Sequence, residues 1–341
     1  GELKKERLNI QRTFDKDSLM PAKTKDGVTL RVFGNIGGPE DCEGVLSNGG
    51  EGVGLFRTES IFLNGDKFPT EEEQFQAYRR SVEAIQPHPV IIRTLDLGGD
   101  KTVNSYYFTE EEANPFMGFR AIRFCLDHPE VFKDQLRAIL RASAYGDVRI
   151  MYPMISSVEE LIRANEILEE ARQELRERKV AFDENTPVGS MIEIPGAAIV
   201  ADLLAEHCDF FSIGTNDLIQ YLLAVDRVND RIAHLYMPNH PAVIRTIDHV
   251  IKTANKNKVD VGICGEMAAD PIYVPLLFGM GANDISVTAT SVAEIKYMLR
   301  QMKLKDAQEL AAKVVKLSDP EEIYMTLTAF YAKLMGDLFK G

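Results

Sequence analysis

The sequence predicts an α/β fold, a (β/α)8 TIM barrel with extra C-terminal helices. Two observations support this prediction. Eight short apolar segments, each followed by a helical pattern, occur between residues 30 and 302, and reactive side chains gather where several of these segments end. Strands that alternate with helices form right-handed βαβ units around a parallel sheet, and eight such units close a barrel. A doubly wound open sheet is the alternative that this alternation leaves.

The first half of the chain supplies four of the expected strands. Residues 2–20 are charged with sparse apolar positions, which is typical of an exposed helix or linker. Strands are expected at residues 30–36, 53–58, 90–95 and 149–154. A short helix at 41–48 stops at Gly49 and Gly50, and a helix from Thr70 to about residue 86 opens with acidic residues. The long segment at 102–146 includes a helix at 129–144.

The second half supplies the other four strands and the last helices. A helix is expected from residue 156 to about 179, where apolar residues recur at helical spacing. Strands are expected at residues 188–194, 210–213, 259–264 and 284–287, each followed by a helical pattern, the last at 292–302. Residues 304–340 predict two more helices, because Asp319 and Pro320 stop one helix and start the next.

Composition excludes several classes of protein. The 341 residues are 45% hydrophobic and 27% charged, as in a globular protein with a sizeable core. A net charge of −13 disfavours binding to nucleic acid or to a membrane surface, and no apolar run approaches the roughly 20 residues of a spanning helix. The four cysteines are scattered, without zinc-site or disulfide spacing. We expect a cytoplasmic protein with reduced thiols and no membrane insertion.

The reactive side chains at the predicted strand ends form a set that suits an anionic substrate. They are three arginines, two carboxylates, one carboxamide and one thiol: Arg57, Arg93, Arg227, Glu193, Asp217, Asn216 and Cys264. Loops at the carboxyl ends of barrel strands build the active site. Several guanidinium groups in one pocket favour a compact anion with several charges. For each arginine an ordinary ion pair is the alternative, for example Arg57 with Glu59.

The two carboxylates, Glu193 and Asp217, predict a hard cation. Magnesium takes one or two protein carboxylates and fills its other positions with water and substrate oxygens. Acid–base work of the glycosidase kind is the rival, but neighbouring arginines would keep both carboxylates ionised. A structural alternative also remains, in which Asn216 or Asp217 is simply the N-cap of the following helix.

Cys264 is the one cysteine with a setting that favours chemistry. A cysteine in a strand is most often a small buried hydrophobic residue, and that interpretation is kept for the other three. Gly262 and Gly265 flank Cys264 and are expected to leave space for a ligand. A thiol there would donate a proton to an enolate or act as a nucleophile. No phosphate-binding P-loop and no Rossmann fingerprint is present in the sequence.

Five segments resemble, in the same order, motifs of the phosphoenolpyruvate-utilising enzymes. They are GLFRTE at residues 54–59, IRTLDLGGDK at 92–101, NPFMGFR at 114–120, FSIGTNDL at 211–218 and GICGE at 262–266. The resemblance covers nearly the whole chain from about residue 27. It is nearest to the C-terminal domain of the Enzyme I branch, which serves the bacterial sugar phosphotransferase system.

This resemblance implies a barrel that binds phosphoenolpyruvate and Mg²⁺ at its C-terminal face, transfers the phosphoryl group and dimerises. The implied roles are phosphate binding by Arg57 and Arg93, carboxylate binding by Asn216 and Arg227, metal binding by Glu193 and Asp217, with Asp217 also beside the substrate, and enolate protonation by Cys264 to give pyruvate. Lys101 and Arg120 match the family as well and would contact phosphate.

The resemblance also implies a missing part. The phosphorylated histidine of the family lies in an N-terminal domain, and none of the six histidines here has its motif. We therefore expect residues 1–25 to be the remnant of an interdomain linker helix and residues 26–341 to be the phosphoenolpyruvate-binding and dimerisation domain. The histidine domain and, through it, the histidine phosphocarrier protein would be the partners.

Three alternatives remain at this point. The chain resembles the corresponding domain of a pyruvate phosphate dikinase or phosphoenolpyruvate synthase almost as well. A lyase barrel acting on a pyruvate-like enolate would use the same metal carboxylates without a phosphate clamp. A catalytically silent dimerisation module would use none of these residues.

Overall fold

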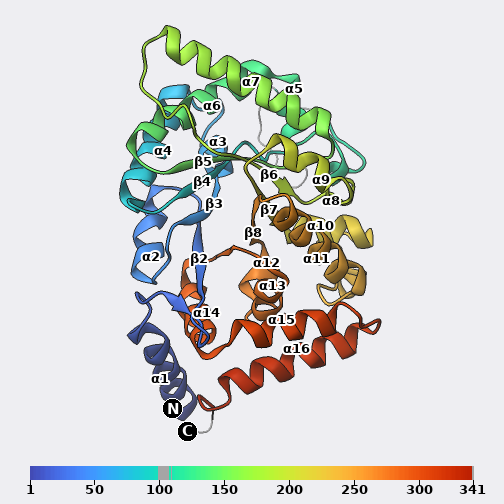
Figure 1. Ribbon diagram of the computed structural model, residues 1–341. Helices are drawn as coiled ribbons and strands as arrows, with labels where there is room; N and C mark the ends of the chain where they lie inside the picture. Colours follow the sequence, from blue (N-terminus) through green and yellow to red (C-terminus); the bar gives the residue numbers. More distant parts are fainter. Residues whose placement is uncertain (99–106, 109, 340–341) are drawn as a thin grey trace. The chain divides into compact units, whose positions relative to one another are not determined.

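The computed structural model describes residues 1–98, 107–108 and 110–339. Its strands are β1 (Ala22–Lys23), β2 (Thr29–Ile36), β3 (Val53–Arg57), β4 (Val90–Arg93), β5 (Val148–Tyr152), β6 (Val188–Ile192), β7 (Phe210–Gly214), β8 (Asp260–Cys264) and β9 (Asp284–Val287) (Figure 1). They follow one another in the sheet in chain order, and β2 also pairs in parallel with β9. The parallel strands β2–β9 therefore close into the predicted (β/α)8 barrel.

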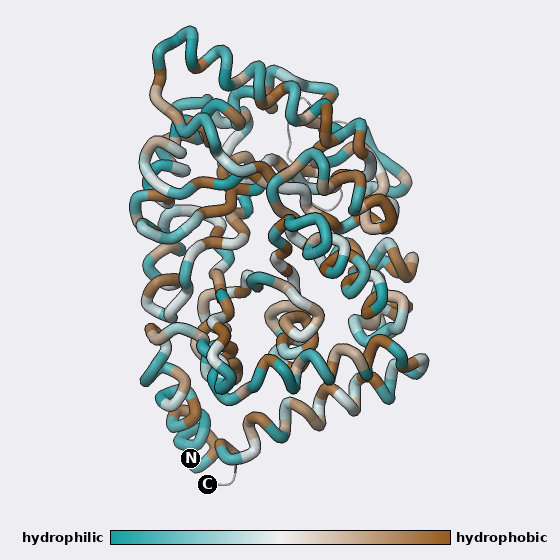
Figure 2. Tube along the Cα trace, in the orientation of Figure 1, coloured by the Kyte–Doolittle hydropathy of each residue, from teal (hydrophilic) through white to brown (hydrophobic). Residues whose placement is uncertain are grey.

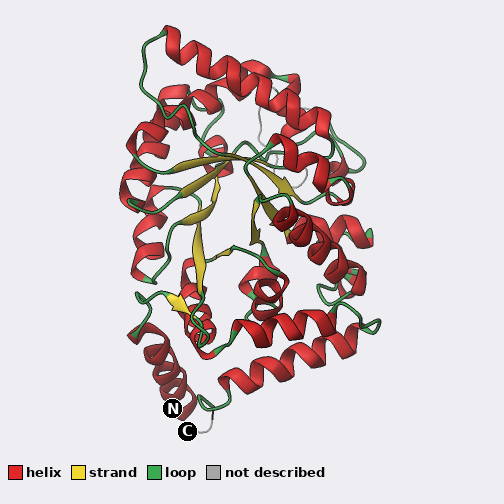
Figure 3. Cartoon of the chain, in the orientation of Figure 1, coloured by secondary structure: helices red, strands yellow, loops and turns green. Residues whose placement is uncertain are grey.

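Helices connect these strands, as Figure 3 shows. The α-helices up to β7 are α1 (Glu2–Lys16), α2 (Cys42–Ser47), α3 (Glu59–Leu63), α4 (Glu71–Ile85), α5 (Ile122–Asp127), α6 (Pro129–Ala142), α7 (Val158–Glu177), α8 (Pro195–Ile199) and α9 (Ala201–Leu204). After β7 come α10 (Thr215–Leu223), α11 (Pro241–Lys256), α12 (Glu266–Ala269), α13 (Val274–Met280), α14 (Ala289–Gln301), α15 (Leu304–Val314) and α16 (Pro320–Met335). Short 3-10 helices occur at Pro39–Asp41, Pro115–Met117, Ser143–Tyr145, Ala205–His207 and Ala233–Leu235.

The predicted elements agree with the observed ones, and the differences have local causes. The strands expected to reach residues 58, 95 and 194 end at Arg57, Arg93 and Ile192. In the first case Thr58 is already the N-cap of α3, and in the third Pro195 opens α8 two residues beyond Glu193. The extra C-terminal helices are confirmed as α15 and α16, and the Asp319 side chain accepts a hydrogen bond from the Glu321 amide at the start of α16.

The N-terminal residues were expected to precede the barrel domain. Helix α1 is mostly exposed, with Phe14 as its buried residue. Residues of β1 pair antiparallel with β2, with Ala22 opposite Leu30.

No described helix is both long and apolar enough to cross a membrane.

The described chain separates into two compact units. The first unit comprises residues 1–34, 44–51 and 213–341, and the second comprises residues 35–43 and 52–212. In the second unit the apolar strand residues Val90, Ile92 and Ile150 are fully buried. In the first unit Val261, Ile285 and Val287 are likewise fully buried. Hydrophilic and hydrophobic residues alternate along the covering helices, as along α7 in Figure 2, because one face of each helix packs and the other is hydrated.

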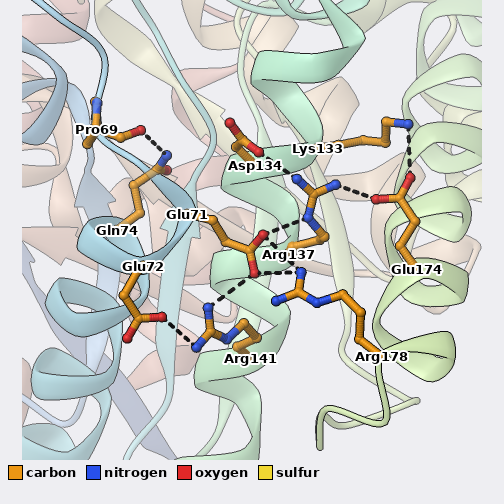
Figure 4. A network of polar contacts seen from close by, with 10 residues as sticks. All are labelled: Pro69, Glu71, Glu72, Gln74, Lys133, Asp134, Arg137, Arg141, Glu174 and Arg178. Atoms are coloured by element: carbon orange, nitrogen blue, oxygen red, sulfur yellow. Dashed lines mark hydrogen bonds and ion pairs between the residues drawn. The ribbon is translucent and has the colours of Figure 1, made fainter.

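Three helices of the second unit, α4, α6 and α7, are joined by a network of charges (Figure 4). Glu71 on α4 is its centre, because its carboxylate accepts hydrogen bonds from Arg137 Nε at 2.8 Å, Arg141 Nη1 at 3.1 Å and Arg178 Nη1 at 3.0 Å. Arg137 also pairs with Glu174 on α7. The network therefore connects α4 to α6 and α6 to α7.

Candidate functional site

Two arginines of the second unit lie where the sequence analysis places them, at the carboxyl ends of neighbouring strands. Arg57 is the last residue of β3 and Arg93 the last of β4, and their Cα atoms are partners in the parallel register. Arg57 is exposed, whereas Arg93 is only 5% exposed. One guanidinium group is thus open to solvent beside one that the protein encloses.

The buried guanidinium group of Arg93 belongs to a cluster of four charges. Arg93 Nη2 pairs with Glu59 and lies 3.4 Å from Asp96 Oδ2. The other oxygen of Asp96 accepts a hydrogen bond from Arg120 Nη2 at 2.9 Å. All four residues are at most 5% exposed. Among the described residues, this cluster contains two cations and two anions, and the carboxylates fix the direction of the Arg93 fork.

Arg120, which the sequence resemblance associates with phosphate, is therefore held by Asp96 in this structure. Lys101, the other residue of that prediction, lies outside the described residues. Contact of Arg120 with phosphate stays a prediction. Sequence spacing did not reveal Asp96 as the link between the two arginines.

Glu193 directly follows β6 and is 2% exposed. Its Oε1 accepts a hydrogen bond from the Met154 amide at 2.6 Å. Met154 follows β5 with a φ of 59°, a left-handed conformation that costs energy for a residue with a side chain. The loop after β5 thus adopts a strained backbone that directs an amide donor onto the carboxylate.

In the first unit, Asn216 and Cys264 are brought together at the ends of β7 and β8. Thr215 Oγ1 donates to the Cys264 carbonyl at 3.1 Å, and the Cys264 thiol donates to the Ile213 carbonyl at 3.6 Å. Asn216 Oδ1 accepts a hydrogen bond from the Glu266 amide at 2.9 Å. The thiol is 1% exposed and held by backbone contacts between the two strand ends.

The positions that side chains at the two glycines beside Cys264 would take are already occupied, whereas access of a ligand to the thiol stays a prediction. A Cβ at Gly265, whose φ is +101°, would lie 2.4 Å from Thr215 Oγ1 and 3.0 Å from Asn216 Oδ1. A Cβ at Gly262 would lie 2.2 Å from an oxygen of Asp284. Protein side chains fill these spaces, so the glycines permit close packing of the β7 and β8 ends.

The structure corrects the alternative in which the side chain of Asn216 or Asp217 caps the helix after β7. The N-cap of α10 is Gly214, without a side-chain cap. The Asn216 side chain instead satisfies the amide of Glu266, the first residue of α12. Asp217 lies in the first turn of α10 and is 8% exposed. A carboxylate there is favoured by the positive end of the helix dipole.

Tyr236 connects the remaining predicted residues of this unit and was not foreseen. Its hydroxyl donates to the Asn216 carbonyl at 3.0 Å. Burial raises the pKa of the Tyr236 phenol, Arg227 lowers it, and Glu266 and Asp217 raise it, so all three charges act on this ring. Arg227 is half-buried, and its amide donates to Gln220 Oε1 at 3.1 Å. An aromatic residue in a loop between helices carries no sequence pattern that would reveal this role.

Each compact unit offers a buried carboxylate of the type that magnesium takes as a ligand. Among the residues described, no three histidine, cysteine or acidic side chains gather as a closed metal site would require. Magnesium needs no such cage, since one or two carboxylates and several waters or substrate oxygens complete its shell. Glu193 and Asp217 are buried carboxylates of that kind.

Comparison with known proteins gives one family match and several relatives. Residues 11–304 match the model of a family described as PEP-utilising enzyme, PEP-binding domain. The chain is 49% identical to a phosphoenolpyruvate-protein phosphotransferase of Priestia megaterium over 294 residues, which is 86% of this chain and 51% of that protein. Relatives of the same name in Bacillus subtilis and Listeria monocytogenes are 46% and 45% identical over 89% and 93% of this chain. The chain spans about half the length of these relatives, 51 to 56%.

Proposed function

Because the chain belongs to the family of PEP-binding domains of PEP-utilising enzymes, we propose that it binds phosphoenolpyruvate with Mg²⁺ and supports phosphoryl transfer from it to a histidine. The acceptor histidine would lie on a separate N-terminal domain, and pyruvate would be released. The observation that carries the proposal is the 45 to 49% identity to relatives named phosphoenolpyruvate-protein phosphotransferase, over most of this chain.

Arg57 and Arg93 bind the phosphate in this proposal. Their register on adjacent strands supports it, because two guanidinium forks from neighbouring strand ends offer several donors to one phosphoryl group. Charge-assisted donors of this kind stabilise the charge that develops on the phosphoryl oxygens during transfer. The exposed Arg57 meets the substrate from solvent, and the enclosed Arg93 is already oriented by Glu59 and Asp96.

The carboxylate and the metal are assigned to the remaining residues. Asn216 and Arg227 bind the carboxylate of phosphoenolpyruvate, and Asp217 lies beside the substrate. Glu193 and Asp217 ligate Mg²⁺, which when bound supplies a Lewis acid for substrate oxygens. The Met154 amide on Glu193 supports this role, since it orients one carboxylate oxygen.

Cys264 acts after the phosphoryl group has left. Transfer breaks the bond between phosphorus and the bridging oxygen and leaves the enolate of pyruvate. The Cys264 thiol then gives its proton to the methylene carbon, forming pyruvate, and the thiolate regains a proton from solvent. The hydrogen bond from the thiol to the Ile213 carbonyl orients the thiol, which supports this assignment.

The whole-protein context follows the relatives. Residues 1–25 are the remnant of a linker to the histidine domain, and residues 26–341 form the barrel domain, which dimerises. The protein acts in the cytoplasm, where the histidine domain passes the phosphoryl group to the histidine phosphocarrier protein of a sugar phosphotransferase system. Sedimentation of the chain alone tests the dimer.

Calorimetry of the chain with phosphoenolpyruvate tests the binding step. We expect saturable binding with Mg²⁺ and a loss of about tenfold or more in affinity after chelation, because the metal neutralises substrate oxygens. Glu193→Gln is expected to remove this dependence on Mg²⁺. A folded chain that binds no phosphoenolpyruvate in the presence of Mg²⁺ would contradict the proposal.

A further inference from the structure

We infer that Gln135 and Thr58 are positioning residues that hold in register the two backbone segments carrying Arg57 and Arg93. The inference rests on the proposed function, since it takes both arginines to bind phosphate. All the contacts on which it depends lie within the second compact unit.

Gln135, on α6, is 1% exposed, and its amide makes contacts in two directions. Its Oε1 accepts a hydrogen bond from the Leu95 amide at 2.8 Å. Its Nε2 donates to Thr58 Oγ1 at 3.1 Å and to the Tyr78 hydroxyl at 3.2 Å. A backbone N–H can only donate, so the side-chain oxygen must face Leu95 and both amide protons face the two hydroxyls. The side chain therefore has one satisfied orientation.

Thr58 passes this contact on to the second arginine segment. Its hydroxyl accepts from Gln135 and donates to the Arg93 carbonyl at 2.8 Å. Thr58 directly follows Arg57, and Leu95 comes two residues after Arg93. The Gln135 side chain thus binds Thr58, the residue after Arg57. It holds the Arg93 segment at the Leu95 amide directly and at the Arg93 carbonyl through Thr58.

Helix α4 contributes further hydrogen bonds to the network. The Tyr78 hydroxyl donates to Gln74 Oε1 at 3.0 Å, and Gln74 Nε2 donates to the Pro69 carbonyl at 3.2 Å. Gln74, Tyr78, Thr58 and Gln135 are at most 1% exposed. Hydrogen bonds in such a dry setting are strong, and leaving one unmade costs the full desolvation of the group. The strand ends are thereby fixed to two helices.

Backbone and side chain of Arg93 are controlled separately. Gln135 and Thr58 hold the backbone on which Arg93 sits, while Glu59 and Asp96 hold its guanidinium group. A misplacement of about 1 Å at a reacting group can cost roughly a hundredfold in rate. Gln135 and Thr58 make no contact with phosphate in this proposal. Their effect must therefore appear as a change in the affinity of the two arginines for the phosphate group.

The test compares Thr58→Val, which has the same shape without the hydroxyl, with Thr58→Ser, which keeps it. Binding of phosphoenolpyruvate and of pyruvate, each with Mg²⁺, is measured by calorimetry on variants shown to be folded by circular dichroism. We expect Thr58→Val to bind phosphoenolpyruvate about tenfold more weakly or worse and pyruvate within about twofold of wild type. Thr58→Ser is expected to restore phosphoenolpyruvate binding to within about threefold.

Ile139→Val is the control for stability, because Ile139 lies on α6 with Gln135, is fully buried and has no polar side-chain group. It lowers stability without touching the network. The inference is overturned when Thr58→Val binds phosphoenolpyruvate like wild type, or loses both ligands to the same extent as Ile139→Val. Wild-type chain that binds neither ligand contradicts the proposed function itself, which separates the two failures.

Discussion

At the scale of single residues, the protein treats its two strand-end arginines differently. Arg93 is enclosed with Glu59, Asp96 and Arg120, where removing one charge would leave a buried partner uncompensated. Arg57 is exposed, so solvent screens the charge that its removal would take away. Stability and ligand binding are therefore separable at Arg57 and coupled at Arg93.

Arg57→Ala is expected to weaken phosphoenolpyruvate binding by about 10- to 150-fold, since charged hydrogen bonds contribute about 1.5–3 kcal/mol. Unfolding by urea should change little, and pyruvate binding should change less than phosphoenolpyruvate binding. Calorimetry and denaturation measure the two effects. Arg163→Ala, which removes an exposed arginine from α7, is the control for charge alone. Unchanged phosphoenolpyruvate affinity in Arg57→Ala would favour a lyase that lacks a phosphate clamp.

Cys264→Ala is expected to bind phosphoenolpyruvate within about threefold of wild type but to slow proton exchange at the pyruvate methyl group by roughly a hundredfold or more. The reason is that the thiol carries a proton and makes no part of the proposed phosphate contact. Nuclear magnetic resonance of pyruvate in deuterated water, with Mg²⁺ and the chain, follows this exchange. Cys208→Ala provides the matched control at a cysteine before β7, and equal exchange in both variants would remove Cys264 from the proposal.

At the scale of elements, ion pairs rather than apolar contacts alone tie α4, α6 and α7 together. Burial raises the pKa of Glu71, but the hydrogen bonds and charges of Arg137 and Arg178 outweigh burial and hold this pKa below its ordinary value of 4.5. A depressed carboxyl pKa in the folded state contributes stability above the unfolded pKa, and this contribution is lost as the pH falls through the folded pKa. Acid should therefore loosen these three helices.

Glu71→Gln is expected to lower the free energy of unfolding by about 1–2 kcal/mol near neutral pH, because three arginines lose their shared carboxylate. The difference from wild type should shrink as the pH falls from 4.5 through the lowered pKa of Glu71 in the folded protein, below which the wild-type carboxylate is also neutral. Urea denaturation at several pH values measures it. Glu166→Gln, in an exposed pair on α7, should stay within about 0.5 kcal/mol of wild type. A difference for Glu71→Gln that persists at low pH would contradict this account.

At the scale of the whole molecule, the chain forms the barrel and spans about half the length of its relatives. The sequence alone predicted all eight barrel strands and the C-terminal helices, because alternating apolar and helical patterns are local properties. It placed Arg57 and Arg93 close to the ends of their strands and Cys264 at the end of its strand, and in the structure each is the last residue of its strand.

Mixing the chain with a separately prepared histidine domain of a relative, phosphoenolpyruvate and Mg²⁺ is expected to produce phosphohistidine on that domain. The chain alone should not become phosphorylated, since none of its six histidines has the acceptor motif. Acid-labile phosphate detected by mass spectrometry is the measurement. Stable phosphorylation of the chain by itself would show that the acceptor assignment is wrong.

The sequence by itself determined the order of strands and helices and which reactive types end the strands. The tertiary structure decided what each of them contacts. Asn216 accepts a hydrogen bond from the first amide of α12, 50 residues away, and Glu59 pairs with Arg93 across 34 residues. Gln135 is buried on α6 together with Phe132, Leu136 and Ile139. The helical spacing of the sequence shows that this polar residue lies among apolar ones, but it does not show which groups bind it. Local propensity sets elements, whereas hydrogen-bond partners depend on segments that meet only after the chain has folded.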